Sequence, residues 1–397
     1  MKKAVIVDGL RTPFGRYKGG LKSIRPDDLA SIVIQNLVDK NKISHLKIDD
    51  VVLGCVNQAG EDNRNVARMS LLLAGLSEEI PGVTVNRLCG SGLEAINQAV
   101  MQIETGRANL IIAGGVESMT RSPLVMLKPE LGYSRGNHTL ADSTIGWRFI
   151  NPRLNQLYPV VTLGESAEIM ADKFHISRRD QDMFSYESHR KASEAEAKGY
   201  FKEEIIPVYE MNSEKILLDR DEHVRIETSF EKLSELPCAF KKHGTVTAGN
   251  SSGINDGAAV LLVMEEEFAI ANGYSPLAEV VTSAVVGVHP SLLGTGPIPS
   301  SLKALERAGL KKEDIDLWEI SEAFASMVLT TVKELNLDPE KVNVNGGGIS
   351  IGHPLGASGA RMTLTLIHEL RRRNLNYGLV TMCIGVGQGI ATILKRY

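Results

Sequence analysis

The sequence predicts an α/β protein in which helices cover both faces of a largely parallel β-sheet. Three observations support this prediction: strand-like runs alternate with helix-like segments, one long stretch breaks the alternation, and the two ends of the chain repeat one arrangement. The chain has 397 residues, of which 43% are hydrophobic. A chain of this length exceeds one core of ordinary size, so two or three domains are expected.

The strand-like runs of the first third are short, continuous and rich in β-branched residues, as in strands buried on both faces. They are KAVIVDG (3–9), DDVVLGCV (49–56), GVTVN (82–86) and NLIIAGG (109–115). The segments between them carry apolar residues at helical spacing; they cover residues 26–41, 65–75 and 90–106. This alternation favours parallel strands joined by crossover helices.

The alternation breaks from about Arg121 to Asn250, where no sustained period is found. One polar-faced helix is predicted inside this stretch, and it begins after the capping residue Ser177. Long irregular segments in compact proteins tend to be lids or binding regions. We therefore interpret the stretch as an insertion, after which the βα alternation resumes at Asn255.

The two ends of the chain look like one design used twice. A strand-like run beginning at Asp49 is followed by a V-x-V-N strand end at Asn86, and a run beginning at Asp314 is followed by the same pattern at Asn345. In both places a glycine-rich turn and a helix-like segment come next. The pattern is compatible with an internal duplication, and equally with two unrelated βαβ units that look alike.

The composition excludes several classes of function. The formal net charge of −4 gives no electrostatic case for binding nucleic acid. No run of 18 or more apolar residues appears, so no membrane span is expected. The N-terminal apolar run is too short for a signal peptide and the C-terminal ATILKRY is no peroxisomal signal, so a cytoplasmic location is expected.

The four cysteines are Cys55, Cys89, Cys238 and Cys383, and none of them forms a C-x-x-C pair. A zinc or redox motif is therefore not expected, and no metal site is predicted. Disulfides are rare in cytosolic enzymes, so each thiol is either a small core residue or a reactive group. We interpret Cys55 and Cys238 as packing or loop residues.

Cys89 stands in NRLCGSGLEAINQAV, where a strand end at Asn86 feeds a helix that begins near Gly92. The free N–H groups and dipole of a helix N-terminus stabilise a thiolate and lower its pKa. Gly90 and Gly92 would let a ligand approach the backbone closely. These features favour a reactive thiol over an inert cysteine in a turn.

His353 lies in NVNGGGISIGHPLGASGARM, where glycine-permitted turns would hold and expose its ring. A histidine beside a cysteine is the general base that thiolate catalysis needs. The other interpretation is a phosphate-cradling loop, but the lysine of a P-loop is missing.

Cys383 follows an apolar strand and precedes a G-x-G-x-G turn that starts at Gly385. This is not the dinucleotide fingerprint, because position 390 is isoleucine and almost no chain remains for a βαβ unit. We expect a second exposed thiol on a flexible turn whose backbone N–H groups could form an oxyanion hole.

Six motifs in order along the chain resemble the thiolase family, the acetyl-CoA C-acyltransferases: NRLCGSG, GTVTAGNSSGINDGAA, GTGPIP, SEAF, NVNGGGISIGHPLGASGARM and CIGVGQG. The resemblance implies two similar βαβαβαββ halves in a five-layered αβαβα core, with an inserted loop domain. It divides the chain into a first half (1–120, completed by 250–272), a loop domain (121–249) and a second half (273–397).

The resemblance implies thiolytic cleavage of a 3-ketoacyl-CoA to acetyl-CoA and a shortened acyl-CoA, or the reverse condensation. Cys89 would be the nucleophile, His353 its activating base, and Cys383 the acid that protonates the departing acetyl-CoA carbanion. The backbone N–H groups of Cys89 and Gly385 would hold the acyl-enzyme oxygen. Coenzyme A is then a substrate, no bound cofactor is needed, and a homodimer or homotetramer is expected.

The resemblance also implies a path for the CoA chain. Ala248 and Ser252 match positions along the pantetheine, and Phe240 and Phe324 match its apolar walls. Arg225 matches a position near the nucleotide, although a solvated surface arginine would look the same.

The chain departs from the family at Ser321, where the usual motif Asn-Glu-Ala-Phe reads Ser-Glu-Ala-Phe. Taken alone, Ser321 looks like the N-cap of a helix. In the family, the asparagine holds a water that forms an oxyanion hole with the histidine. Serine can still donate one hydrogen bond, so we expect activity with a weakened oxyanion hole.

A second detail concerns the substrate. Short-chain acetoacetyl-CoA thiolases typically carry a His-Met pair where this chain has Thr162 and Leu163. With TIGWRFINPRLNQLYP, this resembles the degradative 3-ketoacyl or 3-oxoadipyl branch, and a role in fatty acid metabolism through β-oxidation is expected. The alternatives are a biosynthetic acetoacetyl-CoA thiolase, a ketoacyl synthase, against which Cys383 argues, and a weakly active or non-catalytic acyl-CoA-binding protein.

Overall fold

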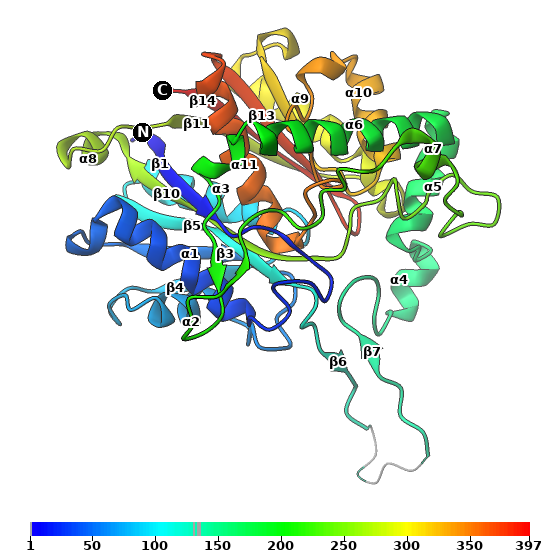
Figure 1. The fold of residues 1–397 in the computed structure, drawn as a ribbon, viewed down its shortest axis with the longest axis horizontal. Coiled ribbons are helices and arrows are strands. Elements are labelled where there is room, and N and C mark those ends of the chain that lie inside the picture. The colour runs from blue at the N-terminus through cyan, green and yellow to red at the C-terminus, as the bar shows by residue number, and fades with distance from the viewer. Residues whose placement is uncertain (1, 130–131, 133–135) are drawn as a thin grey trace.

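A computed structural model describes residues 2–129, 132 and 136–397, and it has an α/β fold built around one ten-stranded mixed sheet. The strands follow the order β12-β13-β14-β11-β1-β10-β5-β3-β4, and the short β2 pairs with β10. Figure 1 shows this sheet at the centre of the molecule, with both ends of the chain on one side.

The strands of the sheet are β1 (Ala4–Arg11), β2 (Gly15–Arg16), β3 (Asp50–Gly54), β4 (Gly82–Val85), β5 (Leu110–Ser118), β10 (Asn255–Glu265), β11 (Ala278–Gly287), β12 (Leu317–Ile320), β13 (Tyr377–Ile384) and β14 (Gln388–Arg396). Two small hairpins pair β6 (Leu124–Val125) with β7 (Ala141–Asp142) and β8 (Val208–Tyr209) with β9 (Ile216–Leu218).

The α-helices are α1 (Pro26–Asn41), α2 (Val66–Leu73), α3 (Ser91–Glu104), α4 (Pro152–Leu157), α5 (Leu163–Phe174), α6 (Arg178–Ala197), α7 (Phe230–Ser234), α8 (Glu266–Ala271), α9 (Pro297–Ala308), α10 (Ala325–Leu335) and α11 (Leu355–Arg372). Short 3₁₀ turns cover Ile43–His45, Tyr200–Glu203, Pro290–Thr295, Lys312–Asp314 and Pro339–Lys341. None of the described helices is long and apolar enough to cross a membrane.

The predicted duplication is confirmed by the order of the strands. One half of the sheet runs β1-β10-β5-β3-β4 and the other runs β11-β14-β13-β12, and the halves join where β1 pairs with β11. Corresponding strands pair in the same direction, because β3 and β5 are parallel, as are β12 and β13. Trp318 of β12 even forms a parallel bridge to Val342, where β3 pairs with β4 in the first half.

The two halves of the sheet enclose a middle layer made of α3 and α11, which pack on each other and on strands of both halves. Their apolar side chains, among them Leu93, Ile96 and Leu364, form a fully buried core with residues from β5, β10 and β13. Helices α1 and α2 cover the outer face of the first half, and α9 and α10 cover that of the second. This is the five-layered arrangement that the resemblance implied.

The prediction of a largely parallel sheet is wrong. Only the pairs β3–β4, β3–β5 and β12–β13 are parallel, and the other pairs of the sheet are antiparallel. Part of the reason is local: β13 and β14 are joined by a turn of three residues, and so short a connection can only reverse the chain. A continuous apolar run indicates that a strand is buried on both faces, but it does not indicate the direction of the neighbouring strand.

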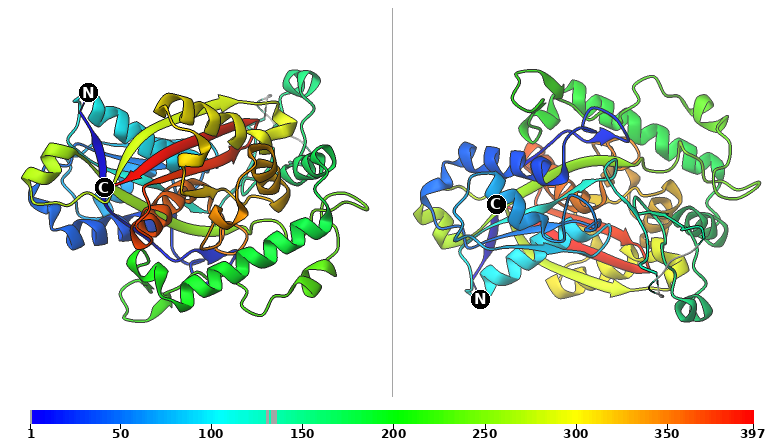
Figure 2. Two further views of the ribbon diagram at one scale, coloured as in Figure 1. Left: turned by 90° about the horizontal axis from the view of Figure 1, so that it is seen from above. Right: turned by 90° about the horizontal axis from the view of Figure 1, so that it is seen from below.

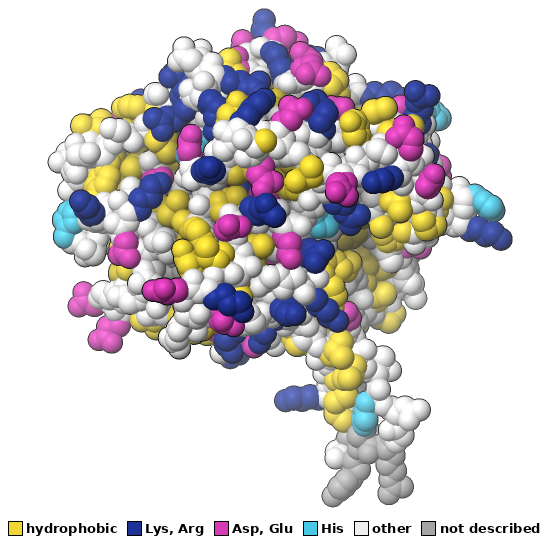
Figure 3. Space-filling model, viewed as in Figure 1, with side chains coloured by type: hydrophobic (Ala, Val, Ile, Leu, Met, Phe, Trp, Pro, Cys, Tyr) yellow, Lys and Arg dark blue, Asp and Glu magenta, His cyan; other side chains and the backbone are white. Residues whose placement is uncertain are grey.

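The insertion lies between the end of β5 at Ser118 and the start of β10 at Asn255, and in both views of Figure 2 its green segments lie around the outside of the sheet. The predicted helix is α6, whose cap Ser177 accepts a hydrogen bond from the Asp180 backbone. The β6–β7 arm projects from the body of the protein, and hydrophobic side chains line its visible face in Figure 3.

Candidate active site

Cys89 sits in a tight turn between β4 and α3. The Asn86 side chain accepts a hydrogen bond from the Leu88 backbone at 2.9 Å, and Ser91 Oγ donates to the Leu88 carbonyl at 2.6 Å. Leu88 has a φ of 47°, in the left-handed region that leucine rarely adopts. The turn places Cys89 two residues before the first residue of α3, which confirms the predicted location at a helix N-terminus.

Burial decides the protonation of this thiol. Burial raises the pKa of Cys89 to about 11, although hydrogen bonding from the backbones of Gly385 and Cys89 itself favours the thiolate. The prediction that the helix N-terminus lowers the pKa is therefore wrong in its net direction, since desolvation outweighs the dipole. In the free protein Cys89 is a neutral thiol at pH 7, and it needs a base.

The glycines beside Cys89 make room for protein, not for a ligand as predicted. A Cβ atom on Gly90 would lie 2.7 Å from Ile384 Cδ1, and one on Gly92 would lie 2.5 Å from the Gly356 carbonyl oxygen. These contacts bring the start of α3 against the end of β13 and the start of α11. The turn that carries Cys89 is thus clamped between the two segments that carry the other candidate residues.

His353 precedes α11, and only one of its two ring nitrogens has a hydrogen-bond partner among the described residues. Gly352 has a φ of 114°, and the His353 backbone donates to Asn255 Oδ1 at 2.9 Å. The ring nitrogen Nδ1 lies 2.6 Å from Ser358 Oγ. Within the described part of the chain, Nε2 is buried and has no hydrogen-bond partner, so this nitrogen is available for proton transfer.

The expectation of an exposed imidazole is wrong, because His353 is only 5% exposed. Burial and the charge of Arg361 lower the pKa of the ring to about 4. The glycine-rich loop packs so closely that Asn255 of β10 lies directly against Gly352. His353 is consequently a neutral imidazole at pH 7, which is the form that accepts a proton.

Cys383 is buried in β13, where it pairs with Gly389, and it does not sit on the turn. Its sulfur lies 3.8 Å from Met327 Sδ, within an apolar cluster that includes Phe324. The prediction of an exposed thiol is therefore wrong, because the strand continues one residue beyond Cys383. Burial, together with the neighbouring Cys89, raises the pKa of Cys383 to about 12, so it holds its proton.

Gly385 begins the turn between β13 and β14. Val386 and Gly387 follow with φ values of 64° and 79°, so the turn has the left-handed conformation of a tight hairpin. Gly385 packs against Leu88, since a Cβ atom there would lie 3.1 Å from Leu88 Cδ1. The backbone of Gly385 also offers a hydrogen bond to the Cys89 sulfur, as an oxyanion-hole donor near this thiol would.

Ser321 follows β12 and is buried, and its backbone donates to the Thr381 carbonyl at 3.0 Å. It is not an N-cap, because α10 begins only at Ala325. Instead, Phe324 has an extended backbone and bridges to Ser251. Tertiary pairing with the segment before β10 displaces the start of the helix that local propensity favours.

The residues predicted to contact CoA lie on two parts of the surface. Ala248 is exposed, Ser252 is half-buried, and Phe240 meets Phe324 edge to face with ring centroids 6.0 Å apart. These residues lie around the bridge between Phe324 and Ser251, close to Ser321 in the chain. Arg225 is exposed and lines a separate shallow hollow.

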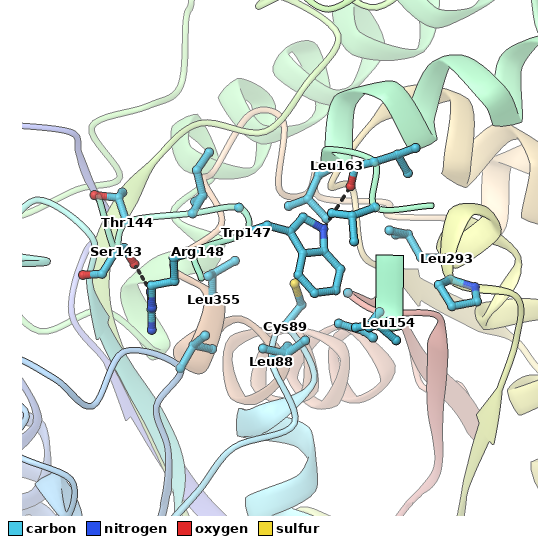
Figure 4. Close-up of a pocket in the computed structure, with 18 of the residues that line it drawn as sticks. Leu88, Cys89, Ser143, Thr144, Trp147, Arg148, Leu154, Leu163, Leu293 and Leu355 are labelled. Atoms are coloured by element: carbon cyan, nitrogen blue, oxygen red, sulfur yellow. Dashed lines mark hydrogen bonds between the residues drawn. The ribbon is translucent and has the colours of Figure 1, made fainter. Parts of the chain in front are cut away.

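A cavity of about 320 Å³ opens onto Cys89. Cys89, Leu88, Gly385 and Val386 form one wall, and loop residues of the insertion form another. Figure 4 shows the Cys89 sulfur directed toward the indole of Trp147, whose Nε1 donates to the Val161 carbonyl at 3.0 Å. The insertion therefore covers the candidate nucleophile.

Sequence reasoning missed three residues of this site. Trp147 and Arg148 line the cavity. The motif TIGWRFINPRLNQLYP that contains them indicated a branch of the family, but it assigned neither residue to the site. Glu117 at the end of β5 accepts hydrogen bonds from the backbones of Val56, Asn57 and Gly356, at 2.9–3.0 Å. It joins the start of α11 to the first half, and burial raises its pKa to about 7.

Comparisons with known proteins agree with this architecture. Residues 4–267 match the family model "Thiolase, N-terminal domain" and residues 274–396 match "Thiolase, C-terminal domain". The chain is 50% identical to the 3-oxoadipyl-CoA/3-oxo-5,6-dehydrosuberyl-CoA thiolase of Escherichia coli K12, over 100% of both chains. Among solved structures, the Bacillus anthracis acetyl-CoA acetyltransferase matches with a TM-score of 0.94 and 40% identity, over 100% of this chain and 99% of that one. Human mitochondrial 3-ketoacyl-CoA thiolase in complex with CoA matches with a TM-score of 0.92 and 38% identity, over 100% and 98%.

Proposed function

The chain belongs to the thiolase family, and we propose that its CoA-dependent thiolytic cleavage runs through Cys89, His353 and Cys383. The enzyme is an acyltransferase, which moves the acyl group of a 3-ketoacyl-CoA to free CoA. The observation that carries the proposal is the position of Cys89, at the N-terminus of α3 and open to an apolar cavity that the Gly385 turn also lines.

The resting protonation states follow from burial. Both thiols are neutral, since the pKa of Cys89 is about 11 and that of Cys383 about 12, and His353 is neutral with a pKa of about 4. Proton transfer from Cys89 to His353 is therefore unfavourable in the empty site. We infer that the sulfur gives up its proton as it attacks the substrate carbonyl, so that no free thiolate accumulates.

In the first half-reaction, the Cys89 sulfur attacks the C3 keto carbon while its proton passes to Nε2 of His353. The C2–C3 bond of the substrate then breaks, and its electron pair goes to C2. Cys383 donates its proton to C2, which releases acetyl-CoA. The remaining acyl group stays on Cys89 as a thioester, with His353 protonated and Cys383 a thiolate.

In the second half-reaction, free CoA enters and gives its thiol proton to the Cys383 thiolate. The CoA sulfur attacks the acyl carbon, and the Cys89 sulfur leaves. Protonated His353 returns a proton to Cys89, so every group ends in its resting state. The backbone N–H groups of Gly385 and Cys89 stabilise the negative oxygen of the acyl carbon, and Ser321 and His353 stabilise that of the acetyl thioester.

We further propose that the substrate is 3-oxoadipyl-CoA or a similar short 3-ketoacyl-CoA, from which thiolysis makes succinyl-CoA and acetyl-CoA. Support comes from relatives at about half identity that are named for this substrate, such as the beta-ketoadipyl-CoA thiolase of Acinetobacter baylyi, at 49%. The cavity agrees, because its volume of about 320 Å³ suits a short acyl chain. Leu163, at a position where acetoacetyl-CoA thiolases carry a different side chain, lines it.

For CoA, we propose that the pantetheine runs past Ser252 and Ala248 and along the ring pair of Phe240 and Phe324. The two rings meet edge to face, and the exposed Phe240 presents an apolar surface to solvent above the buried Phe324. Arg225 would approach the nucleotide, where its exposed guanidinium could meet a phosphate. The solved CoA complex of a similar thiolase supports CoA as a substrate of this chain.

Fatty acid β-oxidation is a second candidate role. The likeness to human mitochondrial 3-ketoacyl-CoA thiolase favours it, because that protein's name carries no restriction on the acyl group. Acetoacetyl-CoA synthesis is a third, favoured by the likeness to an acetyl-CoA acetyltransferase. The three roles differ in the acyl group that the cavity must hold, so one assay separates them.

That assay follows the loss of 3-ketoacyl-CoA absorbance on addition of CoA, with acetoacetyl-CoA, 3-oxoadipyl-CoA and longer 3-ketoacyl-CoA substrates. Cys89→Ala is expected to abolish turnover of all of them. Cys238→Ala is a matched control, because this half-buried thiol only donates to the Gly244 carbonyl, outside the cavity. Activity that survives in Cys89→Ala would refute the assignment of Cys89 as the nucleophile. Folded wild-type protein that binds CoA without turnover would establish the non-catalytic alternative.

We also propose a cytoplasmic homodimer or homotetramer. Apolar side chains are exposed at the edge strand β4 and its neighbours (Val83, Leu72, Leu73, Met101) and on the β6–β7 arm (Leu124, Met126, Leu127, Leu140). Exposed apolar surface of this kind is typical of protein interfaces. Light scattering at micromolar concentration is expected to give the mass of two or four chains, and a monomer would contradict the proposal.

A further inference from the structure

Arg148 is a cation in the wall of the apolar cavity that contains Cys89. It lies in the loop before α4, and Figure 4 shows it beside Ser143 and Thr144, on the same side of the cavity. We propose that Arg148 is the specificity-determining residue of this enzyme, and that it pairs with a carboxylate at the far end of the acyl group. The inference rests on the proposed thiolysis at Cys89.

The guanidinium has little else to bind. Its Nη1 donates to the Ser143 carbonyl at 3.1 Å, which uses one of the five N–H donors of an arginine. Among the residues that the structure describes, no Asp or Glu lines the cavity, and none forms an ion pair with Arg148. The side chain is half-buried, so its charge is partly removed from water without an anion to compensate.

The loop that carries Arg148 is anchored at both ends. Ser143 Oγ donates to the Pro123 carbonyl at 2.6 Å and accepts from Asn57 Nδ2 at 3.0 Å. At the other end, the indole of Trp147 donates to the Val161 carbonyl at 3.0 Å. A guanidinium on a fixed loop, already held by one hydrogen bond, loses little freedom when it binds.

Arg148 lies on the acyl side of the site. It shares its cavity with Cys89, Gly385 and Val386, whereas Ser252 and Phe324, proposed to contact the pantetheine, do not line this cavity. A cation that served the phosphates of CoA would be expected on the CoA path, near Arg225. The position of Arg148 thus matches the part of the substrate that remains on Cys89 after acetyl-CoA leaves.

The chemistry of the substrate supplies the anion. In 3-oxoadipyl-CoA, attack at C3 leaves a four-carbon acyl group on Cys89, and that group ends in a carboxylate. Enclosing this carboxylate in an apolar cavity is costly unless a partner neutralises it. A guanidinium can hold a carboxylate through two parallel hydrogen bonds, and an acyl chain that ends in a methyl group would leave those donors unpaired.

The test compares two substrates that match in chain length, 3-oxoadipyl-CoA and 3-oxohexanoyl-CoA, which differ only in a terminal carboxylate or methyl group. The wild type is expected to prefer 3-oxoadipyl-CoA in kcat/KM. Arg148→Met is expected to lower the ratio of the two kcat/KM values by about 10²-fold, the scale of losing one partner of a desolvated charge pair. Arg148→Lys keeps the positive charge but not the two parallel N–H donors of a guanidinium. Its ratio of kcat/KM values is expected to lie between those of the wild type and Arg148→Met.

Arg153→Met is the matched control, because Arg153 lies in the same segment but is exposed and outside the cavity. It is expected to leave the ratio as in the wild type. A ratio that Arg148→Met does not change, even with both activities lowered together, would overturn the proposal and reduce Arg148 to a structural or CoA-binding residue. The ratio cancels losses caused by partial unfolding.

Binding without turnover gives a second readout. In a Cys89→Ala background, calorimetry is expected to show that adding Arg148→Met weakens the binding of 3-oxoadipyl-CoA much more than the binding of 3-oxohexanoyl-CoA. An equal loss of affinity for both ligands would overturn the proposal. Failure of the proposed function has a different signature, since the wild type would then turn over neither substrate.

Discussion

Gly92 of α3 lies directly against Gly356 of α11, so closely that a Cβ atom on Gly92 would lie 2.5 Å from the Gly356 carbonyl oxygen. The two helices form the middle layer of the fold, and they cross with backbone against backbone. Cys89 precedes the first helix and His353 precedes the second. The same pair of glycines thus sets how close the proposed nucleophile and base can come.

Gly92→Ala is expected to lower both stability and activity. The added methyl group must push α3 and α11 apart, and overpacking of this kind costs about 1–3 kcal/mol. Displacement of Cys89 from His353 is expected to reduce kcat/KM by about 10²-fold. Thermal unfolding and the thiolysis assay measure the two effects. Gly287→Ala is the control, because a Cβ atom there meets nothing within 4 Å; equal behaviour of the two variants would contradict the argument.

The pH profile of kcat/KM is expected to have its acid limb near pH 4. His353 must be neutral to accept a proton, and burial lowers its pKa to about 4, so activity is lost only as the pH falls through that value. The pKa of Cys383, about 12, keeps the proposed acid protonated across the neutral range. A rate profile over the pH range in which circular dichroism shows folded protein tests this. An acid limb near the ordinary histidine value of about 6.5 would show that His353 is less buried than described.

Ser321→Asn is expected to raise kcat. Serine is shorter than the asparagine usual at this position in the family, and a missing oxyanion donor costs about 10²–10³ in rate. The variant restores the longer side chain at a buried position beside β12. Ser321→Ala is the opposite control and is expected to lower kcat. Unchanged turnover in Ser321→Asn would mean that serine already supplies the donor.

Val386→Gly is expected to stabilise the fold and to weaken substrate selection. A β-branched residue at a φ of 64° is strained by about 1–2 kcal/mol, and glycine removes that strain. Val386 also lines the acyl cavity, so its loss widens the site. A higher melting temperature together with a higher KM for short 3-ketoacyl-CoA substrates is the expected pair of results. A lower melting temperature would show that packing of Val386 outweighs its strain.

Local signals in the sequence were sufficient for several elements. The strand end at Asn86 and the following glycines predicted a thiol at a helix N-terminus, and Cys89 lies there. Ser177 predicted the start of α6, because a capping residue acts within three residues of itself. In both cases the cause and its effect are close together in the chain. The repeated V-x-V-N strand ends were only compatible with a duplication, which the order of the strands shows.

Burial was the property that the sequence did not reveal. Cys383 and His353 were expected to be exposed, but both are buried. The pKa of Cys89 was expected to be lowered, but desolvation raises it. What buries a side chain comes from distant segments: Met327 lies against Cys383, and Asn255 lies against the loop of His353. No window of sequence around a residue contains that information.

The sequence by itself determined the family, the layered α/β architecture and the residue types that can do the chemistry, because ordered motifs and periodicities are properties of the chain. Only the tertiary structure decided the direction of most strands, the protonation of Cys89 and His353, and the cavity that brings Arg148 to the acyl side of the site. These properties depend on the pairing, the distances and the solvent exposure of groups far apart in the chain. The cavity in particular forms only where the loops of the insertion fold over the turns that carry Cys89 and Gly385.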